Sequence, residues 1–268
     1  YNLILCLRLS TDKNPKFPDI NFEGRMEIDF TYYDTKQEDI FLNFCGTIQS
    51  IQINSKPTTV NYKDKRIYLS HLDLICGAKN HVVILFSTKY GTSGAGLHHF
   101  IDPIDKKEYL YTLFAPYDCN LVFPVFDQPN IKGNLKLTLV GPEEWILLGN
   151  EKEECTWKLT KDTKEDDKDI PAINEVLSPL TNEEYDFLFN SIFDKNYKIT
   201  IFNETPKLSS YLFAISAGPY FSIKNPYKYE VPMRIFMRES LKKLGEPKEF
   251  FRVTIAGMEF YKKFFGIS

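Results

Sequence analysis

The chain has 268 residues, of which 43% are hydrophobic and 26% are charged, a composition typical of a soluble globular protein with one large domain or two small ones. Its formal net charge is −3, which excludes the electrostatic footprint of a nucleic-acid-binding or anionic-membrane-binding surface. No run of 18 apolar residues is present, so we predict no membrane span.

The cysteines and the first residues bear on the cellular compartment. The five cysteines are an odd number, lie far apart and show no C-x-x-C spacing, so we predict reduced thiols and an intracellular, cytoplasmic location. They are Cys6, Cys45, Cys76, Cys119 and Cys155. The opening YNLILCLRLS lacks the features of a signal peptide and an initiator Met, so we expect a processed product or part of a longer polypeptide.

The first 160 residues predict one short strand after another. Apolar and polar residues alternate with period two in four segments rich in Ile, Val, Phe and Tyr, which are 22–33, 39–54, 81–90 and 134–142. Turn residues such as Gly141-Pro142 separate these segments. This pattern indicates a saddle-like sandwich of antiparallel sheets.

A charged run, KDTKEDDKD (161–169), interrupts the strands and opens an insertion over about residues 161–195. Within it, Thr181 and Glu184 have the spacing of a helix capping box. The helix that follows places four apolar residues on one face, which are Leu188, Phe189, Ile192 and Phe193. Packing on the protein's own sheet is the favoured interpretation of this face, and contact with a partner is the alternative.

Strands resume at 197–203, 209–223 and 231–238, and the chain closes with a helix over 246–266. Pro247 suits its first turn, and Gly266 suits the residue that ends it. The predicted fold is therefore mainly β, with a β domain over residues 1–240, an inserted short helix, and a terminal helical segment over 246–268.

The residues themselves display no catalytic motif. The sequence contains no H-E-x-x-H, G-x-S-x-G or Walker A pattern, and GTSGAG (91–96) suits a hairpin turn better than a phosphate loop. His98 and His99 are the only adjacent histidines, and on a strand they point to opposite faces, which disfavours a shared metal ion. The carboxylates of Asp102, Asp105, Asp118 and Asp127 lie near aromatic residues, but sequence alone does not pair them.

One stretch, GLHHFIDPIDKKEYLYTLFAPYDCNLVFPVFDQP (96–129), carries a specific resemblance. It resembles the segment of gluzincin aminopeptidases, of the aminopeptidase N and puromycin-sensitive type, that contains T-Q-x-E-P and F-P-C-[FW]-D-[EQ]-P. The matching structural positions are Pro116, Asp118, Phe123, Pro124, Asp127 and Pro129. Further similar segments follow in the family's order, at 22–30, 134–150 and 206–220.

The resemblance implies a saddle-shaped β domain that covers a zinc peptidase domain. It also implies that the zinc ligands, the H-E-x-x-H and the G-A-M-E-N motif, belong to a segment beyond Ser268. We therefore expect no catalytic residue and no metal ligand within these 268 residues, and zinc only if a catalytic domain follows.

Two positions depart from the family pattern where the family's Gln and Glu grip the substrate's free amine. Leu113 stands at the Gln position and Ala115 at the Glu position. The family's basic residues are replaced by Asn120 and Leu121. These changes predict a pseudoenzyme-like, non-catalytic interaction module with protein partners. The alternative is the N-terminal domain of an active zinc aminopeptidase.

Overall fold

The apolar run near the N-terminus forms the centre of the main sheet. In strand β1 (Asn2–Cys6), Leu3 and Leu5 point into the larger hydrophobic core, while Ile4 and Cys6 point into a smaller core on the other side. Side chains alternate between the two faces of a strand, so a strand that is apolar throughout must be covered on both. β1 pairs in parallel with β11 (Lys136–Pro142) and antiparallel with β2 (Asn21–Thr31).

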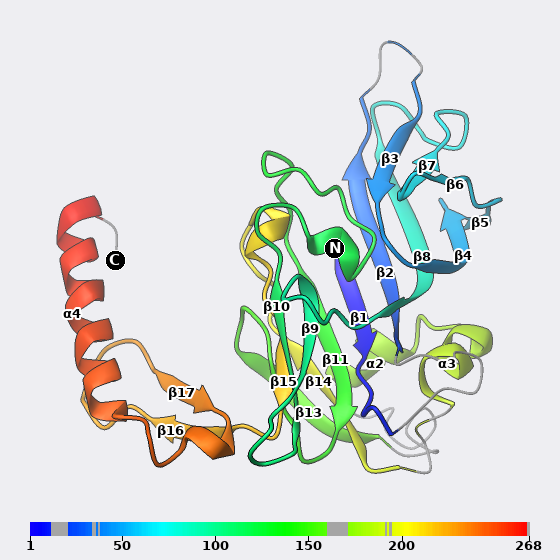
Figure 1. Ribbon diagram of the computed structural model, residues 1–268. Helices are drawn as coiled ribbons and strands as arrows, with labels where there is room; N and C mark the ends of the chain where they lie inside the picture. Colours follow the sequence, from blue (N-terminus) through cyan, green and yellow to red (C-terminus); the bar gives the residue numbers. More distant parts are fainter. Residues whose placement is uncertain are drawn as a thin grey trace.

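The computed structural model describes residues 1–11, 21–33, 36, 38–159, 171–190, 192 and 195–266. The main sheet has eight strands and twists through the body of the molecule (Figure 1). In spatial order the other strands are β13 (Glu153–Leu159), β14 (Tyr197–Phe202) and β11 (Lys136–Pro142) on one side of β1, then β2 (Asn21–Thr31), β8 (Lys79–Lys89), β4 (Thr47–Ile53) and β5 (Lys56–Pro57) on the other.

A four-stranded antiparallel sheet covers the face of the main sheet that bears the larger core. Its strands, in spatial order, are β12 (Ile146–Leu148), β15 (Ser216–Gly218), β10 (Glu108–Leu113) and β9 (Gly96–Ile101). A smaller sheet of β3 (Ile40–Asn43), β7 (Arg66–Leu69) and β6 (Tyr62–Lys63) completes the body. The mainly β, saddle-like prediction is confirmed, with β1 and β11 as a parallel pair within otherwise antiparallel sheets.

The single strand expected over 39–54 is divided between two sheets. β3 pairs with β7, whereas β4 pairs with β8 after a sharp change of direction at residues 44–46. A Cβ at Gly46 would lie 2.3 Å from the Phe44 ring and 2.7 Å from the carbonyl oxygen of Ser87. Only glycine leaves room for this close approach, which the alternating pattern of the sequence does not reveal.

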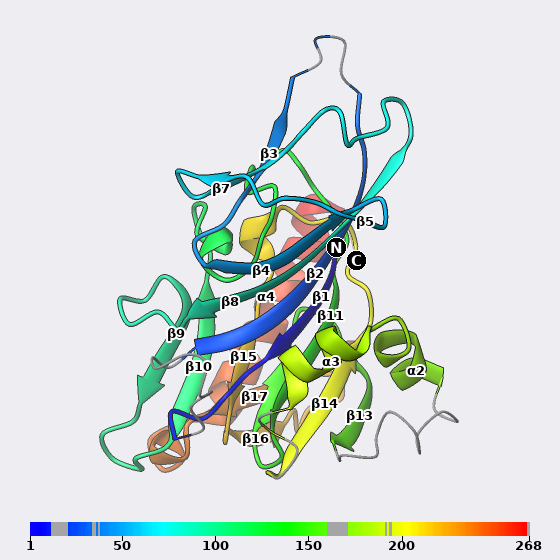
Figure 2. The same ribbon diagram turned by 90° about the vertical axis from the view of Figure 1, so that its right-hand side faces the viewer.

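The insertion after β13 covers the other face of the main sheet (Figure 2). Helix α3 (Asn182–Phe189) begins with the predicted capping box, in which Thr181 and Glu184 each bond the other's backbone N–H. Leu188, Phe189 and Ile192 are completely buried on the protein's own sheet, so they offer no surface to a partner. Phe193 and the charged run 161–169 lie outside the described residues.

Helix α2 (Pro171–Leu177), which precedes α3 in the insertion, is not predicted from the sequence. Its Ile173, Val176 and Leu177 join the smaller core.

Two buried arginines bind α3 to the sheet beneath it. The Arg25 Nε bonds Glu184 Oε1 at 3.2 Å, and Arg8, paired with Glu23 at 2.6 Å, donates to the carbonyl oxygen of Leu188 at 3.4 Å.

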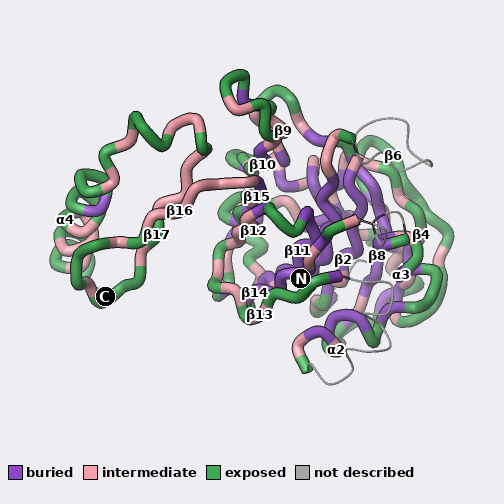
Figure 3. The backbone as a smooth tube through the Cα atoms, turned by 90° about the horizontal axis from the view of Figure 1, so that it is seen from below, coloured by how far each residue is buried: buried purple, intermediate pink, exposed green. Residues whose placement is uncertain are grey.

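The last part of the chain extends away from the body as an arm (Figures 1 and 3). It consists of the hairpin of β16 (Phe221–Lys224) and β17 (Arg234–Met237), followed by helix α4 (Pro247–Phe265). Pro247 opens the helix and Gly266 ends it at φ 68°, as the sequence predicts. None of the helices in the described ranges combines the length and the apolar character that a membrane crossing requires.

Removing the Thr181 cap should loosen the cover of the smaller core. We expect Thr181→Ala to lower the free energy of unfolding by about 1 kcal/mol, because the backbone N–H of Glu184 loses its acceptor. Urea unfolding followed by circular dichroism measures this change. Thr92→Ala, at an exposed turn, is the matched control and should change the free energy by less than about 0.5 kcal/mol. Equal effects of the two variants would contradict the assigned role of the cap.

Candidate functional site

Strand β10 presents two chemically distinct faces at the predicted site. Leu110 and Phe114 point inward and are almost fully buried, and Phe114 packs edge-on against Phe123 with ring centroids 5.9 Å apart. Leu113 and Ala115 point outward and are exposed, Leu113 to 51%. The alternation of a strand therefore separates the scaffold side of this motif from its solvent side.

The loop after β10 is held by the carboxylate of Asp127. One of its oxygens, Oδ2, accepts hydrogen bonds from the backbone N–H of Asn120 at 3.0 Å and from Asn120 Nδ2 at 2.7 Å. The other, Oδ1, accepts from Ser210 Oγ at 2.7 Å. An ionised carboxylate only accepts hydrogen bonds, so three donors that converge on it form a strong attachment. Asp127 thus joins the 114–129 loop to the segment that starts β15.

Neighbouring residues repeat this connection between distant segments. Ser209 Oγ donates to the carbonyl oxygen of Pro129 at 2.6 Å. Thr112 exchanges hydrogen bonds with the backbone of Ile215, and its Oγ1 accepts from the Ile215 N–H at 2.8 Å. The similar segments 96–129 and 206–220, recognised separately in the sequence, are therefore two halves of one hydrogen-bonded unit.

The other structural positions of the motif also belong to the scaffold. Phe123 and Pro124 are buried, and Val125 pairs with Asn43 of β3. Pro116 is exposed and follows a cis peptide bond. Asp118 is half-buried and precedes the short 3-10 helix η1 (Cys119–Leu121) without forming a side-chain cap.

The positions that depart from the family pattern differ in what they now do. Leu113 and Ala115 expose only apolar groups, and neither side chain can accept a hydrogen bond from an ammonium group. Asn120, in contrast, is tied to Asp127, to the carbonyl oxygen of Tyr117 and to the thiol of Cys45. Leu121 packs against the larger core. Two of the substituted positions are thus absorbed into the scaffold, and two form an apolar outer face.

Cys119 is completely buried beside this loop. Burial raises the pKa of its thiol well above the usual value, with the nearby Asp127 carboxylate acting in the same direction. The thiol therefore stays protonated near neutral pH and has no nucleophilic character.

The two adjacent histidines do not share a site. His98 packs on Tyr111, with ring centroids 5.0 Å apart, and its Nδ1 accepts from the Gly94 N–H. His99 points the other way and its Nε2 lies 2.7 Å from Glu108. Within the described part of the chain, no group of three or more His, Cys, Asp or Glu side chains is placed to hold a metal ion.

A polar cluster that the sequence did not pair joins the arm to the body. Asp102, in the turn after β9, is 1% exposed, and its Oδ2 accepts from Arg238 Nη1 at 2.8 Å and from Ser240 Oγ at 2.6 Å. The Ser240 hydrogen bond and the Arg238 charge lower the pKa of Asp102, so the carboxylate stays ionised. Arg238 also lies over the Phe100 ring, 4.7 Å from its centroid.

These features agree with the comparison to known proteins. Residues 1–167 match the Peptidase M1 N-terminal domain, and the chain therefore belongs to this family. It is 28% identical over 224 residues to "Aminopeptidase N" of Streptomyces lividans, which covers 82% of this chain and 21% of that protein. It is 26% identical over 260 residues to "Aminopeptidase 2" of Candida albicans, with coverages of 94% and 24%.

A third relative, "Aminopeptidase 2, mitochondrial" of Saccharomyces cerevisiae, is 23% identical over 277 residues, which is 98% of this chain and 25% of that protein. The chain thus spans about a quarter of the length of the curated relatives it matches, or less. The resemblance inferred from residues 96–129 is confirmed at the level of the domain.

The Asp127 tie can be tested directly. Ser210→Ala should lower the free energy of unfolding by about 2 kcal/mol, because a buried hydroxyl loses its bond to a carboxylate. Ser93→Ala, at an exposed turn, is the matched control and should be nearly neutral. Urea unfolding of both variants measures the difference, and a Ser210→Ala effect no larger than the control effect would refute the tie.

The Glu108 carboxylate makes stability depend on pH. Burial acts to raise its pKa, but hydrogen bonds from His99 and Ser10 outweigh burial and hold the pKa below the usual value. The contribution of the Glu108 carboxylate to the free energy of unfolding is therefore full above the pKa of the unfolded state, about 4.3. It is lost as the pH falls through the lower pKa of the folded state. Melting temperatures of the parent and Glu108→Gln should differ at pH 7 and converge near pH 3 or below. A difference that persists unchanged in acid would contradict this assignment.

Proposed function

We propose that this chain is a non-catalytic, aminopeptidase-like N-terminal module that works as a structural and interaction domain in a larger assembly. The observation that carries the proposal is the outer face of β10. Leu113 and Ala115 are exposed there, where the resemblance expects a Gln and a Glu that bind an amine. A buried ammonium that loses such partners is left uncompensated, which costs several kcal/mol.

The arm supports an interaction role. Six apolar residues of α4 are each more than half exposed, which are Phe250, Val253, Phe260, Tyr261, Phe264 and Phe265. Only Phe251 of this helix is buried. An exposed aromatic surface of this kind is typical of a face that another protein segment covers. In this proposal the cover is a partner protein or the remainder of a longer M1-type polypeptide.

An alternative function is the N-terminal domain of an active zinc aminopeptidase. The names of the relatives and the limited share of their length that this chain spans favour it. In that case the amine would be held by the catalytic domain, which would also supply the zinc ligands and the general base. The exposed α4 face would then pack into that domain.

The deciding experiment uses the native polypeptide purified from its source. Its intact mass, its zinc content and its hydrolysis of a chromogenic amino-acid anilide are measured together. The non-catalytic proposal expects no hydrolysis, with or without added zinc. Zinc-dependent hydrolysis by the native protein would overturn it and establish the alternative.

A paired substitution sharpens the test of the outer face. Leu113→Gln with Ala115→Glu is introduced into the native polypeptide, and Tyr211→Gln with Leu212→Glu, at two other exposed positions, is the matched control. We expect neither pair to create binding of an amino-acid amide or hydrolysis. Activity that appears with the first pair and not with the control would show that only these two side chains separate the protein from an aminopeptidase.

A further inference from the structure

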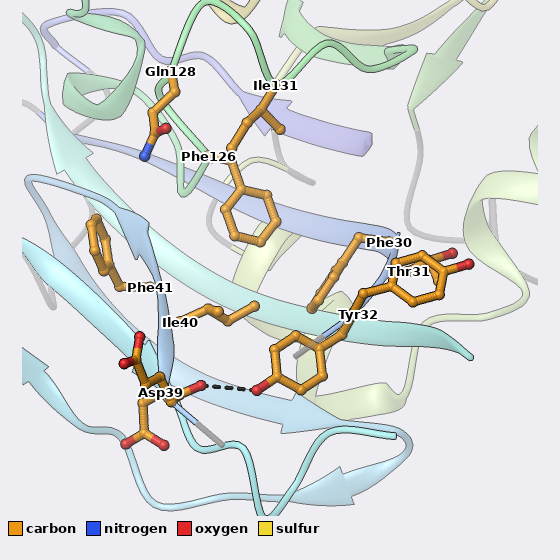
Figure 4. A pocket seen from close by; sticks show the side chains of 11 residues that line it. Phe30, Thr31, Tyr32, Asp39, Ile40, Phe41, Phe126, Gln128 and Ile131 are labelled. Carbon is orange, nitrogen blue, oxygen red and sulfur yellow. Dashed lines mark hydrogen bonds between the residues drawn. The ribbon is translucent and has the colours of Figure 1, made fainter. Parts of the chain in front are cut away.

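A pocket of about 450 Å³ lies where the end of β2, the start of β3 and the 126–131 loop meet (Figure 4). Phe126 and Ile131 reach it from the loop, Phe30 and Tyr32 from the end of β2, and Ile40 from β3. The volume is within the range of about 300–1,000 Å³ that small-molecule and side-chain sites occupy. Neither the amine-binding positions nor the arm contributes to it.

The walls of this pocket are aromatic. Phe30 and Phe126 pack edge to face with centroids 5.2 Å apart, and the Tyr32 and Phe41 rings complete the enclosure. Tyr32 is fixed by the hydrogen bond from its hydroxyl to the carbonyl oxygen of Glu38, at 2.9 Å. Ring faces carry negative electrostatic potential, so they attract a cation. The Arg66 guanidinium lies 4.3 Å from the centroid of Phe41, an instance of this attraction beside the pocket itself.

The charged side chains among the lining residues are carboxylates, and the Arg66 cation lies beside the pocket over Phe41. Glu38 and Asp39 contribute carboxylates, and the described residues that line the pocket include neither lysine nor arginine. Asp39 is oriented by His71, whose backbone N–H and Nδ1 both bond Oδ1, at 2.9 and 2.8 Å. These bonds lower the pKa of Asp39 and keep it ionised. Both hydrogen bonds from His71 go to Oδ1 of Asp39, so Oδ2 takes no part in this contact. A carboxylate oxygen can accept further hydrogen bonds.

Aromatic faces and carboxylates together recognise one class of ligand. A simple metal ion binds oxygen cages and gains little from rings, and an anion would be repelled by both carboxylates. A lysine or arginine side chain meets both requirements, because its aliphatic stem packs on the rings while its charged end reaches the carboxylates.

We propose that this pocket binds the basic side chain of a peptide or protein, with Phe30, Tyr32 and Phe126 holding the stem and Glu38 and Asp39 pairing with the cation. Two other hollows differ in charge, since Lys89 lines one, in the body, and Arg238 lines the other, between β10 and the arm. The proposal does not rest on whether the chain serves a catalytic assembly.

The test is a titration of the ¹⁵N-labelled chain, followed by heteronuclear NMR. The probes are N-acetyl-lysine methylamide and its uncharged counterpart N-acetyl-norleucine methylamide. We expect saturable shifts confined to residues 30–33, 38–41 and 126–131, and roughly tenfold weaker binding of the norleucine probe, because it lacks the cation. Shifts elsewhere, no saturable shift, or equal binding of the two probes would overturn the proposal.

Variants separate the charge from the rings. Glu38→Gln should lower the affinity for the lysine probe roughly threefold, as expected for a partly exposed ion pair. Glu175→Gln, at an exposed position of α2, removes the same charge far from the pocket and should leave the affinity unchanged. Phe30→Leu keeps an apolar side chain but removes the ring face and should weaken the binding of the probe as well. The NMR spectrum of each variant reports whether it is folded, so loss of binding is not mistaken for unfolding. An unchanged affinity in both Glu38→Gln and Phe30→Leu would refute the assignment.

Discussion

The architecture depends on the burial of β1 on both faces. Its residues alternate between two separate hydrophobic cores, with Leu3 and Leu5 in one and Ile4 and Cys6 in the other. A sheet with two apolar faces exposes hydrophobic surface unless both faces are covered. The four-stranded sheet covers one face, and α2 and α3 cover the other. The insertion is therefore part of the core of this domain, fastened by the buried Arg8 and Arg25.

The site and the scaffold have separate sets of residues on the same short stretch. Inward and loop residues such as Phe114, Phe123 and Asp127 hold the body together, while the side chains of Leu113 and Ala115 are exposed on the outer face. Because the two sets of residues are separate, the exposed side chains can differ without a change in the contacts that hold the fold.

Much of the fold could be predicted because its signals are local. Period-two alternation located β2, β8 and β11, a strand was expected where β14 lies, and capping residues located α3 and α4. The parallel pairing of β1 with β11 joins residues more than 130 positions apart, so no local pattern reports it. The tie between Asp102 and Arg238 and the pocket around Phe30 and Phe126 also depend on such distant contacts. The resemblance alone predicted the motif loop.

The Asp102 cluster has a mechanical consequence. The turn after β9 is bonded through one carboxylate to both Arg238 and Ser240, which lie just beyond β17. The segment that follows β17 is thereby attached to this turn, with α4 beyond it at the free end of the arm (Figure 1). A contact made by α4 therefore acts on a segment that is hydrogen-bonded, through Arg238 and Asp102, to the turn between β9 and β10.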